Sequence, residues 1–510
     1  MGGLKTLLTA ALGGSILIGA CAQMPSAQEA SEEAFQKVSP KLVEYQERYE
    51  PALVQASPRV HAAFAYDYAN YGYIEGDDGV IVVDTGWFPD QARRSMADYR
   101  ALTDKPVVAV IYTHLHPDHY GGASGLLAEE DFDGPIYGPE GWDRWFRESF
   151  SSIRPELYRR IYAQMGMLLP EGEDGTVGSG VGPRPAIGGT PAFSHQPNVA
   201  IGEHTILNIS GVEIHLIPTP GDLNEHLYIW LPNEKVLFAG DVIAGTFPAI
   251  ETVRFEAGRD PALQISAYQR ALDLEPDFII GGHGRLLTSA EDVREVIGAW
   301  RDVTQFMVDQ LDRAYINGLS ADDVIDTLKL PPALADHPDL QLHYHRLEWM
   351  IKTMHLKRAG FIGEAMDYVT LTNSEEAERL VPLMGGRDAV FDAAEDALAD
   401  EPRWSARLAT YLLEVDESDE AARALRQSAF QRIAGTTISA NERNYLLTII
   451  KEERGEIDWE ALFSGPDLQI IETLDTETVL DLMRARFRAE AADEDAFSIA
   501  LTVSGEAAPH

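Results

Sequence analysis

The stretch THLHPDHYGG (113–122) places three histidines and one aspartate in the spacing H-x-H-x-D-H. These residues, His114, His116, Asp118 and His119, directly follow an apolar run that is typical of a buried strand. Four such side chains behind one strand would repel one another or remain unpaired without a cation. Imidazole and carboxylate are ligands that suit zinc, with manganese or iron as alternatives. The stretch therefore predicts two half-sites for metal, His114 with His116 and Asp118 with His119.

The same arrangement recurs along the chain, because strand-like apolar runs repeatedly end in polar residues. Strand ends of this kind carry the active-site side chains of α/β proteins. Four further examples are GVIVVDTG (79–86), VEIHLIPTPGD (212–222), KVLFAGD (235–241) and DFIIGGHG (277–284). We therefore expect an α/β domain in which the ends of these strands meet at one site.

Taken together and in this order, the five motifs resemble the metallo-β-lactamase superfamily. The resemblance implies an αββα sandwich and two zinc ions with Asp241 as their bridging ligand. One ion would have the ligands Asp118, His119 and His283, and the other His114, His116 and a residue of 219–226. Asp118 and Asp241 are the expected catalytic residues. Asp84 is expected to orient a ligand imidazole.

Within that superfamily the chain is similar to the alkyl sulfatases from about residue 60 to its end. The stretches that carry the similarity are THLHPDH (113–119), ANYGYIEGDDGVIVVDTG (69–86), EHLYIWLP (225–232), FPAIETVRF (247–255), YHRLEWMIKTMHLKRAGFIGE (344–364) and DEAARALRQSAFQRIA (419–434). The similarity implies an α-helical dimerisation domain after the sandwich and a homodimer. It also implies hydrolysis of a small-molecule alkyl sulfate ester to an alcohol and sulfate, with metal-bound hydroxide as the nucleophile.

The same similarity bears on the stretch TPGDLNEH (219–226), which offers Asp222, Glu225 and His226 as ligands. Alkyl sulfatases have a carboxylate where most of the superfamily has the histidine after T-P-G, so we interpret Asp222 as the ligand. Asp241 follows 19 residues later, a span that lets both lie at neighbouring strand ends. His226 is the alternative ligand, or else part of the pocket wall, and Glu225 is interpreted as a solvated turn residue.

The sulfate-binding cation is expected in ETVRFEAGRD (251–260), where Arg254 stands at the family's arginine position. Arginine suits this task because its planar guanidinium donates two hydrogen bonds to adjacent oxygens. We interpret the neighbouring Arg259 as part of a surface ion pair. Its expected partners are Glu251, Glu256 or Asp260.

The chain departs from the family pattern at two places that bear on its substrate. Asp241 stands where alkyl sulfatases typically have glutamate. The family's sterol-carrier-like domain is represented only by 466–510, in which we expect a helix (476–491) and a strand (496–504). The alternatives to a sulfatase are a hydrolase of another ester class (phosphodiester, lactone or β-lactam) and a lipid-anchored metal-binding protein without activity.

The N-terminus is typical of an exported protein. Residues 1–20 combine a lysine with an apolar run too short to span a bilayer, as signal peptides do. LIGAC (17–21) resembles a bacterial lipobox, and Cys21 is the only cysteine of the chain. We therefore expect a periplasmic protein, or one attached to a bacterial membrane only through a lipid on Cys21. A simple secretory signal is the alternative.

Periodicity and composition predict the remaining domains. They are a tether and N-terminal segment (21–59), a metallo-β-lactamase-like catalytic domain (60–300), an α-helical dimerisation domain (301–465) and a truncated sterol-carrier-like segment (466–510). The formal net charge of −41 argues against a nucleic-acid partner, whose phosphates would be repelled.

Overall fold

The structure, a computed structural model, describes most of the chain from Gln36 onward. The described residues are 36–142, 144, 154–185, 195–254, 258–363, 365–463 and 476–485. The expected signal peptide, Cys21 and the strand expected at 496–504 lie outside them, and α20 (Thr476–Ala485) covers part of the helix expected at 476–491. None of the described helices is long and apolar enough to cross a membrane.

The first sheet has seven strands, which follow one another in sequence order. They are β1 (Ala52–Ser57), β2 (Val60–Phe64), β3 (Tyr71–Glu75), β4 (Val80–Val83), β5 (Val107–Ile111), β6 (Ile136–Pro139) and β7 (Val199–Ile201). The strands from β1 to β4 pair antiparallel, and those from β4 to β7 pair parallel. All four residues of β4 (VIVV) are buried, as a continuous apolar run requires when both faces of a sheet are covered.

The second sheet has five strands in the order β12-β11-β10-β9-β8. They are β8 (Thr205–Ile209), β9 (Val212–Pro218), β10 (Leu227–Leu231), β11 (Val236–Gly245) and β12 (Phe278–Gly284). Only β11 and β12 pair parallel, so their C-terminal ends lie at the same edge of the sheet. The strands expected in GVIVVDTG, VEIHLIPTPGD, KVLFAGD and DFIIGGHG are present as β4, β9, β11 and β12.

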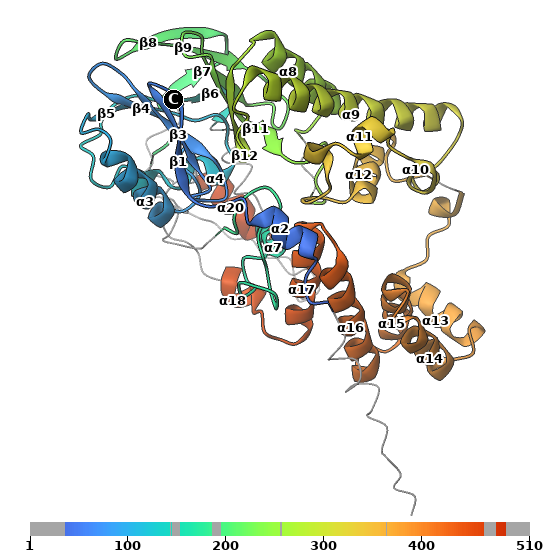
Figure 1. Cartoon of the computed structure of the whole chain (residues 1–510). Coiled ribbons are helices and arrows are strands. Elements are labelled where there is room, and N and C mark those ends of the chain that lie inside the picture. The colour runs from blue at the N-terminus through green and yellow to red at the C-terminus, as the bar shows by residue number, and fades with distance from the viewer. Residues whose placement is uncertain are drawn as a thin grey trace, which may run out of the picture. The chain divides into compact units, whose positions relative to one another are not determined.

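The two sheets pack face to face and carry helices on their outer faces (Figure 1). Between the sheets, residues such as Ile81 and Ile111 of the first sheet share one apolar cluster with Ile229 and Phe238 of the second. Outside the first sheet, α3 (Pro89–Arg100) contributes Met96 and Tyr99 to a separate cluster. Outside the second, α8 (Pro261–Asp273) and α9 (Ala290–Ile316) cover the other face. The expected αββα sandwich is confirmed.

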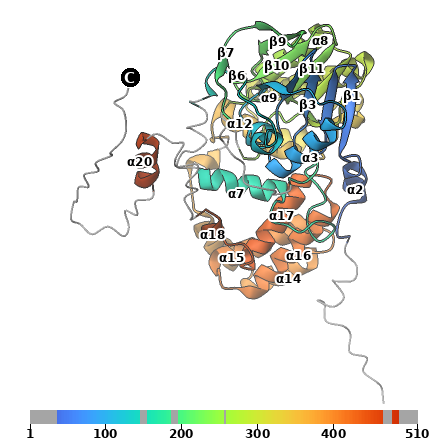
Figure 2. The ribbon, with the colours of Figure 1, turned by 90° about the vertical axis from the view of Figure 1, so that its left-hand side faces the viewer.

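The remaining helices include two short ones next to the metal motif and a long helical region. They are α2 (Pro40–Gln46), α4 (Pro117–Tyr120), α5 (Ala123–Leu126), α7 (Arg154–Met165), α10 (Ala321–Thr327), α11 (Pro332–Ala335), η1 (Pro338–Leu340), α12 (Leu347–Ala359), η2 (Ala365–Tyr368), α13 (Asn373–Leu383), α14 (Arg387–Ala397), α15 (Pro402–Val415), α16 (Glu420–Thr436), α17 (Ala440–Glu453) and α18 (Trp459–Phe463). The helical character expected after the sandwich is confirmed, and α7 lies against α17 (Figure 2).

The first sheet and α9 (Ala290–Ile316) extend across two of the domain limits that the periodicity predicted. The first sheet already begins at Ala52, and α9 runs without a break across residue 300. The apolar face of α9 continues from Trp300 to Leu311, and α12 packs Met350 into the same cluster as the second sheet. The apolar core of the second sheet is therefore continuous with that of the first helices after it. Helices α13 to α16 form a cluster of their own.

Candidate metal centre

The candidate ligands lie in or after four strands and on the short helix α4. His114 and His116 follow β5, and α4 carries Asp118 and His119. Asp222 lies between β9 and β10, Asp241 lies in β11 and His283 in β12. Because β11 and β12 are parallel neighbours, their polar ends face the loop after β5 together. Each of the histidines among them is at least nine-tenths buried.

These seven side chains form two groups that share one residue. His114, His116, Asp222 and Asp241 form the first, and Asp118, His119, Asp241 and His283 form the second. Within each group the nitrogen and oxygen atoms that could bind an ion lie within 4.8 Å of one another. The structure thus brings together every side chain that the sequence assigned as a metal ligand.

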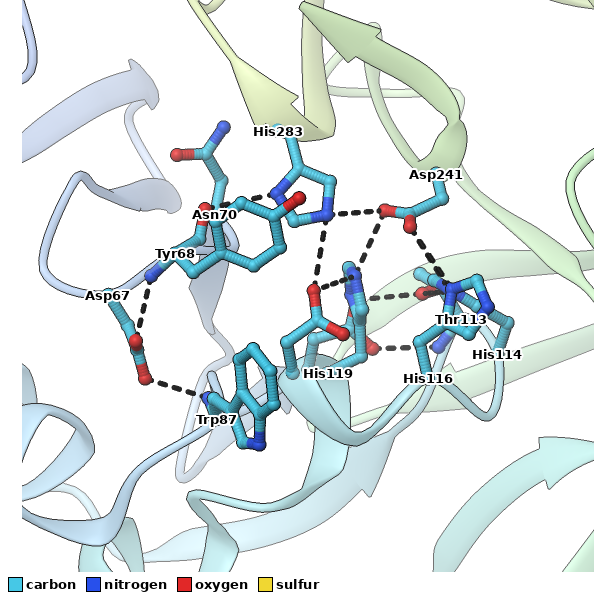
Figure 3. A network of polar contacts seen from close by, with 12 residues as sticks. Asp67, Tyr68, Asn70, Trp87, Thr113, His114, His116, His119, Asp241 and His283 are labelled. Atoms are coloured by element: carbon cyan, nitrogen blue, oxygen red, sulfur yellow. Dashed lines mark hydrogen bonds and ion pairs between the residues drawn. The ribbon is translucent and has the colours of Figure 1, made fainter. Parts of the chain in front are cut away.

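Asp241 faces both groups, one with each carboxylate oxygen (Figure 3). Its Oδ1 lies 3.0 Å from Nε2 of His119 and 3.1 Å from Nε2 of His283. Its Oδ2 lies 3.2 Å from Nδ1 of His116 and 3.5 Å from Nε2 of His114. This is the geometry of a carboxylate that can bridge two ions.

Several buried atoms of the site are placed to bind a divalent cation and do not form hydrogen bonds with one another. Nε2 of His119, Oδ2 of Asp118 and Oδ1 of Asp241 are buried and make no hydrogen bond to any described residue. Burial, followed by the charge of His119, lowers the pKa of His114 well below its ordinary value, which leaves a neutral imidazole suited to metal binding. Burial alone would raise the pKa of Asp118, but His119 and His283 lower it to about 2. Burial lowers the pKa of His119, but the charges of Asp241, Asp84 and Asp118 outweigh it and raise that pKa well above its ordinary value, so a bound cation would take the place of a proton there. Imidazoles and ionised carboxylates without sulfur match zinc or a similar divalent ion.

Asp84 orients His119 by direct contact and His114 through the hydroxyl of Thr113. Its Oδ2 lies 2.8 Å from Nδ1 of His119, so the expected contact with a ligand imidazole is confirmed. The same oxygen accepts the hydroxyl proton of Thr113 at 2.7 Å, and that hydroxyl lies 3.0 Å from Nδ1 of His114. Since the hydroxyl has only one proton, Nδ1 of His114 must donate to it. Both histidines are thereby held with Nδ1 toward Asp84 and Thr113 and with Nε2 directed at the site.

A loop after β2 orients His283, and sequence reasoning missed it. Nδ1 of His283 lies 3.0 Å from the carbonyl oxygen of Tyr68, and the Asn70 amide donates to the carbonyls of Gly281 and Gly284 at 3.1 and 3.0 Å. Asp67, completely buried, accepts hydrogen bonds from the backbone N–H groups of Tyr68 and Trp87, both at 2.7 Å. The sequence signal for this loop was the polar residues of AYDYAN (65–70), but their spacing is not typical of metal ligands.

The stretch 219–226 contributes Asp222 to the site and keeps His226 at its wall. Oδ2 of Asp222 lies 3.4 Å from Nδ1 of His116. The ring of His226 is stacked on that of His114 with centroids 5.0 Å apart, and it belongs to neither group. Glu225 pairs with Arg144 away from the site. The geometry therefore favours Asp222 and agrees with the wall position for His226.

The sequence interpretation of Arg259 was wrong. Its side chain is only 4% exposed and forms an ion pair with Asp222, itself 1% exposed. The expected partners are engaged elsewhere, because Asp260 caps α8 through the N–H of Ala262 at 2.8 Å and Glu251 pairs with Lys357 at 2.8 Å. Glu256 lies outside the described residues. The chain before α8 turns inward, which directs Arg259 at the metal groups.

A pocket opens onto both groups and has a largely apolar wall. Arg254 lines it together with His116, Asp118, Asp222, Asp241 and His283. The apolar side consists of Trp87, Leu157, Tyr158, Ile161, Met165, Val181 and Ala249. Tyr344, from the helical region, also lines the pocket, as do Tyr68, Pro117, Ala244 and Arg259. An anionic group beside the metal groups and an apolar group along α7 would both find suitable surroundings.

An αββα sandwich with paired histidine and aspartate groups at its strand ends defines a metallo-β-lactamase-type hydrolase that binds divalent metal. Residues 66–283 match the metallo-beta-lactamase superfamily, and residues 320–456 match the alkyl sulfatase dimerisation family.

Among known proteins, a linear primary-alkylsulfatase of Pseudomonas sp. is 30% identical over 412 residues, which cover 78% of each chain. An alkyl/aryl-sulfatase of Saccharomyces cerevisiae, BDS1, is 27% identical over 86% of this chain and 69% of its own. The structure of the stereoselective inverting sec-alkylsulfatase Pisa1 from Pseudomonas sp. matches with a TM-score of 0.81 at 24% identity, over 91% of this chain and 75% of its own. The chain belongs to the alkyl sulfatase family of the metallo-β-lactamase superfamily.

Proposed function

We propose that this enzyme hydrolyses alkyl sulfate esters to an alcohol and sulfate at a centre of two zinc ions. The names of its relatives support the substrate class, since both primary and secondary alkylsulfatases are among them. The observation that carries the binuclear centre is Asp241, whose two oxygens each face one group of ligand atoms. The pocket supports the substrate, because an arginine lies at its metal end and an apolar wall beyond.

In this proposal each group of side chains would hold one ion. His114, His116 and Asp222 would hold the first, Asp118, His119 and His283 would hold the second, and Asp241 would be shared between them. Bound divalent ions would supply positive charge and lower the pKa of water at the centre, so that hydroxide is available near neutral pH. Asp118 and Asp241 would accept hydrogen bonds from the attacking water and orient it toward the ester. No serine or cysteine is required as a nucleophile.

Arg254 has the role of binding the sulfate group. One of its N–H groups donates to the Gln164 side chain at 3.4 Å, and a guanidinium offers five donors in total. The guanidinium lines the pocket beside the metal groups, where its planar fork can hold adjacent sulfate oxygens in a bidentate contact and stabilise negative charge that develops in the transition state.

The assembly and the location are separate parts of the proposal. The match of 320–456 to the alkyl sulfatase dimerisation family supports a homodimer formed through the helical region. The sequence of residues 1–21 supports export to the periplasm, with lipid attachment at Cys21. Labelled fatty acid should enter the wild type but not Cys21→Ser in a bacterial host. Equal labelling of both would contradict the attachment site.

A substrate panel tests the activity. Zinc-loaded protein should release sulfate from primary or secondary alkyl sulfates with a kcat/KM well above that for phosphodiesters, lactones and β-lactams. His283→Ala should lose the activity, whereas Asn224→Ala, an exposed change in the Asp222 loop, should retain it. A dominant rate on one of the other esters would replace the sulfatase proposal with that activity. Bound metal with no turnover of any ester would favour a metal-binding protein.

A further inference from the structure

The candidate ligand His283 stands on a glycine-rich backbone. It belongs to the stretch GGHG (281–284) at the end of β12, in which it is the only residue with a side chain. Glycine loses more conformational freedom on folding than any other residue. The other histidines of the two metal groups instead follow β5 or lie on α4. The position of His283 therefore depends on contacts from elsewhere in the chain.

Glycine is required in this stretch because the end of β12 packs tightly against β11. A Cβ atom on Gly282 would lie 2.2 Å from Oδ1 of Asp241, the carboxylate that both metal groups share. A Cβ atom on Gly284, whose φ is 80°, would lie 2.0 Å from Cα of Gly245. Distances this short exclude a side chain at either position. The glycines thus give Asp241 room beside His283, but they leave the backbone of the stretch intrinsically flexible.

Asn70, in the loop after β2, holds this stretch with three hydrogen bonds. Its side-chain NH2 group donates to the carbonyl oxygens of Gly281 and Gly284 at 3.1 and 3.0 Å. Its backbone N–H donates to the carbonyl oxygen of Gly282 at 2.7 Å. Because carbonyl oxygens can only accept, these contacts fix the orientation of the amide. Asn70 is 5% exposed, and it binds the backbone on both sides of His283 (Figure 3).

Tyr68, two residues earlier, holds the imidazole itself. Nδ1 of His283 donates to the Tyr68 carbonyl oxygen at 3.0 Å, which turns Nε2 toward the metal groups. Nε2 lies 3.2 Å from Oδ2 of Asp118 and 3.1 Å from Oδ1 of Asp241. Residues 68–70 thus hold both the ring and the backbone of this ligand, which belongs to the second metal group and not to the first.

We propose that Asn70 is a positioning residue for the second metal group, so that the affinity of this group for its ion depends on the loop after β2 and that of the first group does not. The inference rests on the two-ion centre of the proposed function and does not involve the substrate. Without the bonds from Asn70 the glycine-rich stretch would sample more conformations, and an ion bound at His283 would have to restrict them. The first group keeps all of its ligands.

Zinc affinity tests the inference, measured for full-length protein by competition with a chromophoric chelator. In Asn70→Ala the ion of the second group should bind about 10- to 100-fold more weakly, as is typical when a contact behind a metal ligand is lost, while the other ion keeps its wild-type affinity. Asn70→Ser, a smaller change that leaves one hydroxyl donor, should give a smaller loss in the same direction. Equal weakening of both ions, or of neither, would overturn the inference.

The variant His283→Ala assigns the affected ion. It removes a ligand of the second group, so the ion that it retains is the one held by the first group. In this background Asn70→Ala should leave the affinity for the retained ion unchanged. A weaker affinity for that ion would show that Asn70 acts on both groups and would overturn the inference.

Asn444→Ala is the matched control for a merely structural role. Asn444 is completely buried, and its NH2 group also donates to two backbone carbonyl oxygens, those of Gln164 and Gly178, at 3.1 and 3.3 Å. Both variants should lower the Tm of the metal-free protein, because each leaves buried carbonyl groups without a donor. Only Asn70→Ala should weaken the ion of the second group. The same weakening in Asn444→Ala would overturn the positioning role.

Hydrogen exchange gives a readout that needs neither metal nor turnover. In the metal-free protein, deuterium uptake at 281–287 should be higher in Asn70→Ala than in the wild type and in Asn444→Ala. This segment includes the N–H of Gly284, which donates to the Val181 carbonyl oxygen at 2.5 Å. Uptake there that is unchanged in Asn70→Ala would contradict the inference.

The measurements separate this inference from the proposed function. Wild-type protein that binds two zinc ions with the expected dependence on Asn70 but hydrolyses no alkyl sulfate would retain the inference and refute the activity. Hydrolysis of alkyl sulfates by a protein whose zinc affinities are unchanged in Asn70→Ala would retain the activity and refute the inference. A wild type that holds only one zinc ion would also refute it.

Discussion

Arg259 and Asp222 form an ion pair inside the protein, with 4% and 1% of their side chains exposed. Oδ1 of Asp222 contacts the guanidinium, while Oδ2 lies 3.4 Å from Nδ1 of His116. The carboxylate is therefore shared between a permanent cation and a candidate metal position. This sharing ties the stability of the ion pair to the presence of metal.

Removal of the Arg259 guanidinium should destabilise the metal-free protein more than the zinc-loaded protein. In the metal-free protein, Arg259→Met leaves a buried carboxylate unneutralised, which typically costs about 3–5 kcal/mol. Zinc bound at Asp222 would compensate part of that charge, so the drop in Tm should be clearly smaller in the zinc-loaded protein. Thermal denaturation of wild type and variant, each with chelator and with zinc, provides the comparison. The same drop in both states would argue against Asp222 as a ligand.

Metal stoichiometry should depend on which group is changed. His116→Ala and His283→Ala each remove one nitrogen from one group, so each should reduce bound zinc from two ions per chain toward one. Asp241→Ala removes the shared carboxylate and should weaken both positions. Dialysis followed by elemental analysis gives the ratios. A single ion in the wild type, or an Asp241→Ala protein that still holds one ion as tightly as His283→Ala, would contradict the bridging role.

Asp84→Asn should weaken metal binding without disturbing the fold. Asp84 has a φ of 56°, in the left-handed region that asparagine tolerates well among non-glycine residues. Both carboxylate oxygens accept, Oδ1 from the backbone N–H of Thr113 at 2.7 Å and Oδ2 from the Thr113 hydroxyl and His119, so an amide must turn its NH2 group toward one of these donors. Changes of this kind behind a ligand typically reduce metal affinity by about 10- to 100-fold. Chelator competition measures the effect, and an unchanged affinity would mean that His119 needs no orientation by Asp84.

The buried Asp67 should make stability depend on pH in an unusual direction. Burial raises its pKa from 3.8 to about 6, although backbone N–H groups of Phe88, Tyr68 and Trp87 oppose the shift. The unfolded chain thus releases this proton near pH 3.8 and the folded protein near pH 6, so Asp67 costs stability as the pH rises through that window. The full cost is on the order of 3 kcal/mol.

Asp67→Asn, which stays neutral, isolates this effect. Its Tm relative to that of the wild type should improve as the pH rises from 4 to 7, with chelator present so that metal does not contribute. The lost acceptor also destabilises the variant, but that loss does not vary with pH. A Tm difference that stays constant across the range would contradict the raised pKa.

The sequence was sufficient to predict the sandwich and the metal groups because five motifs, in their order, resemble those of the metallo-β-lactamase superfamily. H-x-H-x-D-H is a contiguous motif, whereas Asp222 follows β9, and Asp241 and His283 lie on the parallel neighbours β11 and β12. The order and spacing of the motifs therefore predicted which side chains, far apart in the sequence, lie together at the site.

Other parts of the site depend on tertiary contacts that no local pattern encodes. Arg259 looked like a surface residue because acidic neighbours surround it in the sequence, yet the inward turn before α8 gives it Asp222 as a partner. Tyr68 and Tyr344 are separated by 276 positions and meet only because the helical region packs beside the loop after β2. The strand signals end near residue 300, but only the tertiary packing shows that the apolar core continues along α9.

The most direct test of the central claim is sulfate release from a series of primary and secondary alkyl sulfates by zinc-loaded protein, with Asp222→Ala and Asn224→Ala measured alongside. We expect release by the wild type and by Asn224→Ala that varies with the length of the alkyl chain, and loss of release in Asp222→Ala. No release from any member of the series by wild-type protein with two bound zinc ions would contradict the proposed activity.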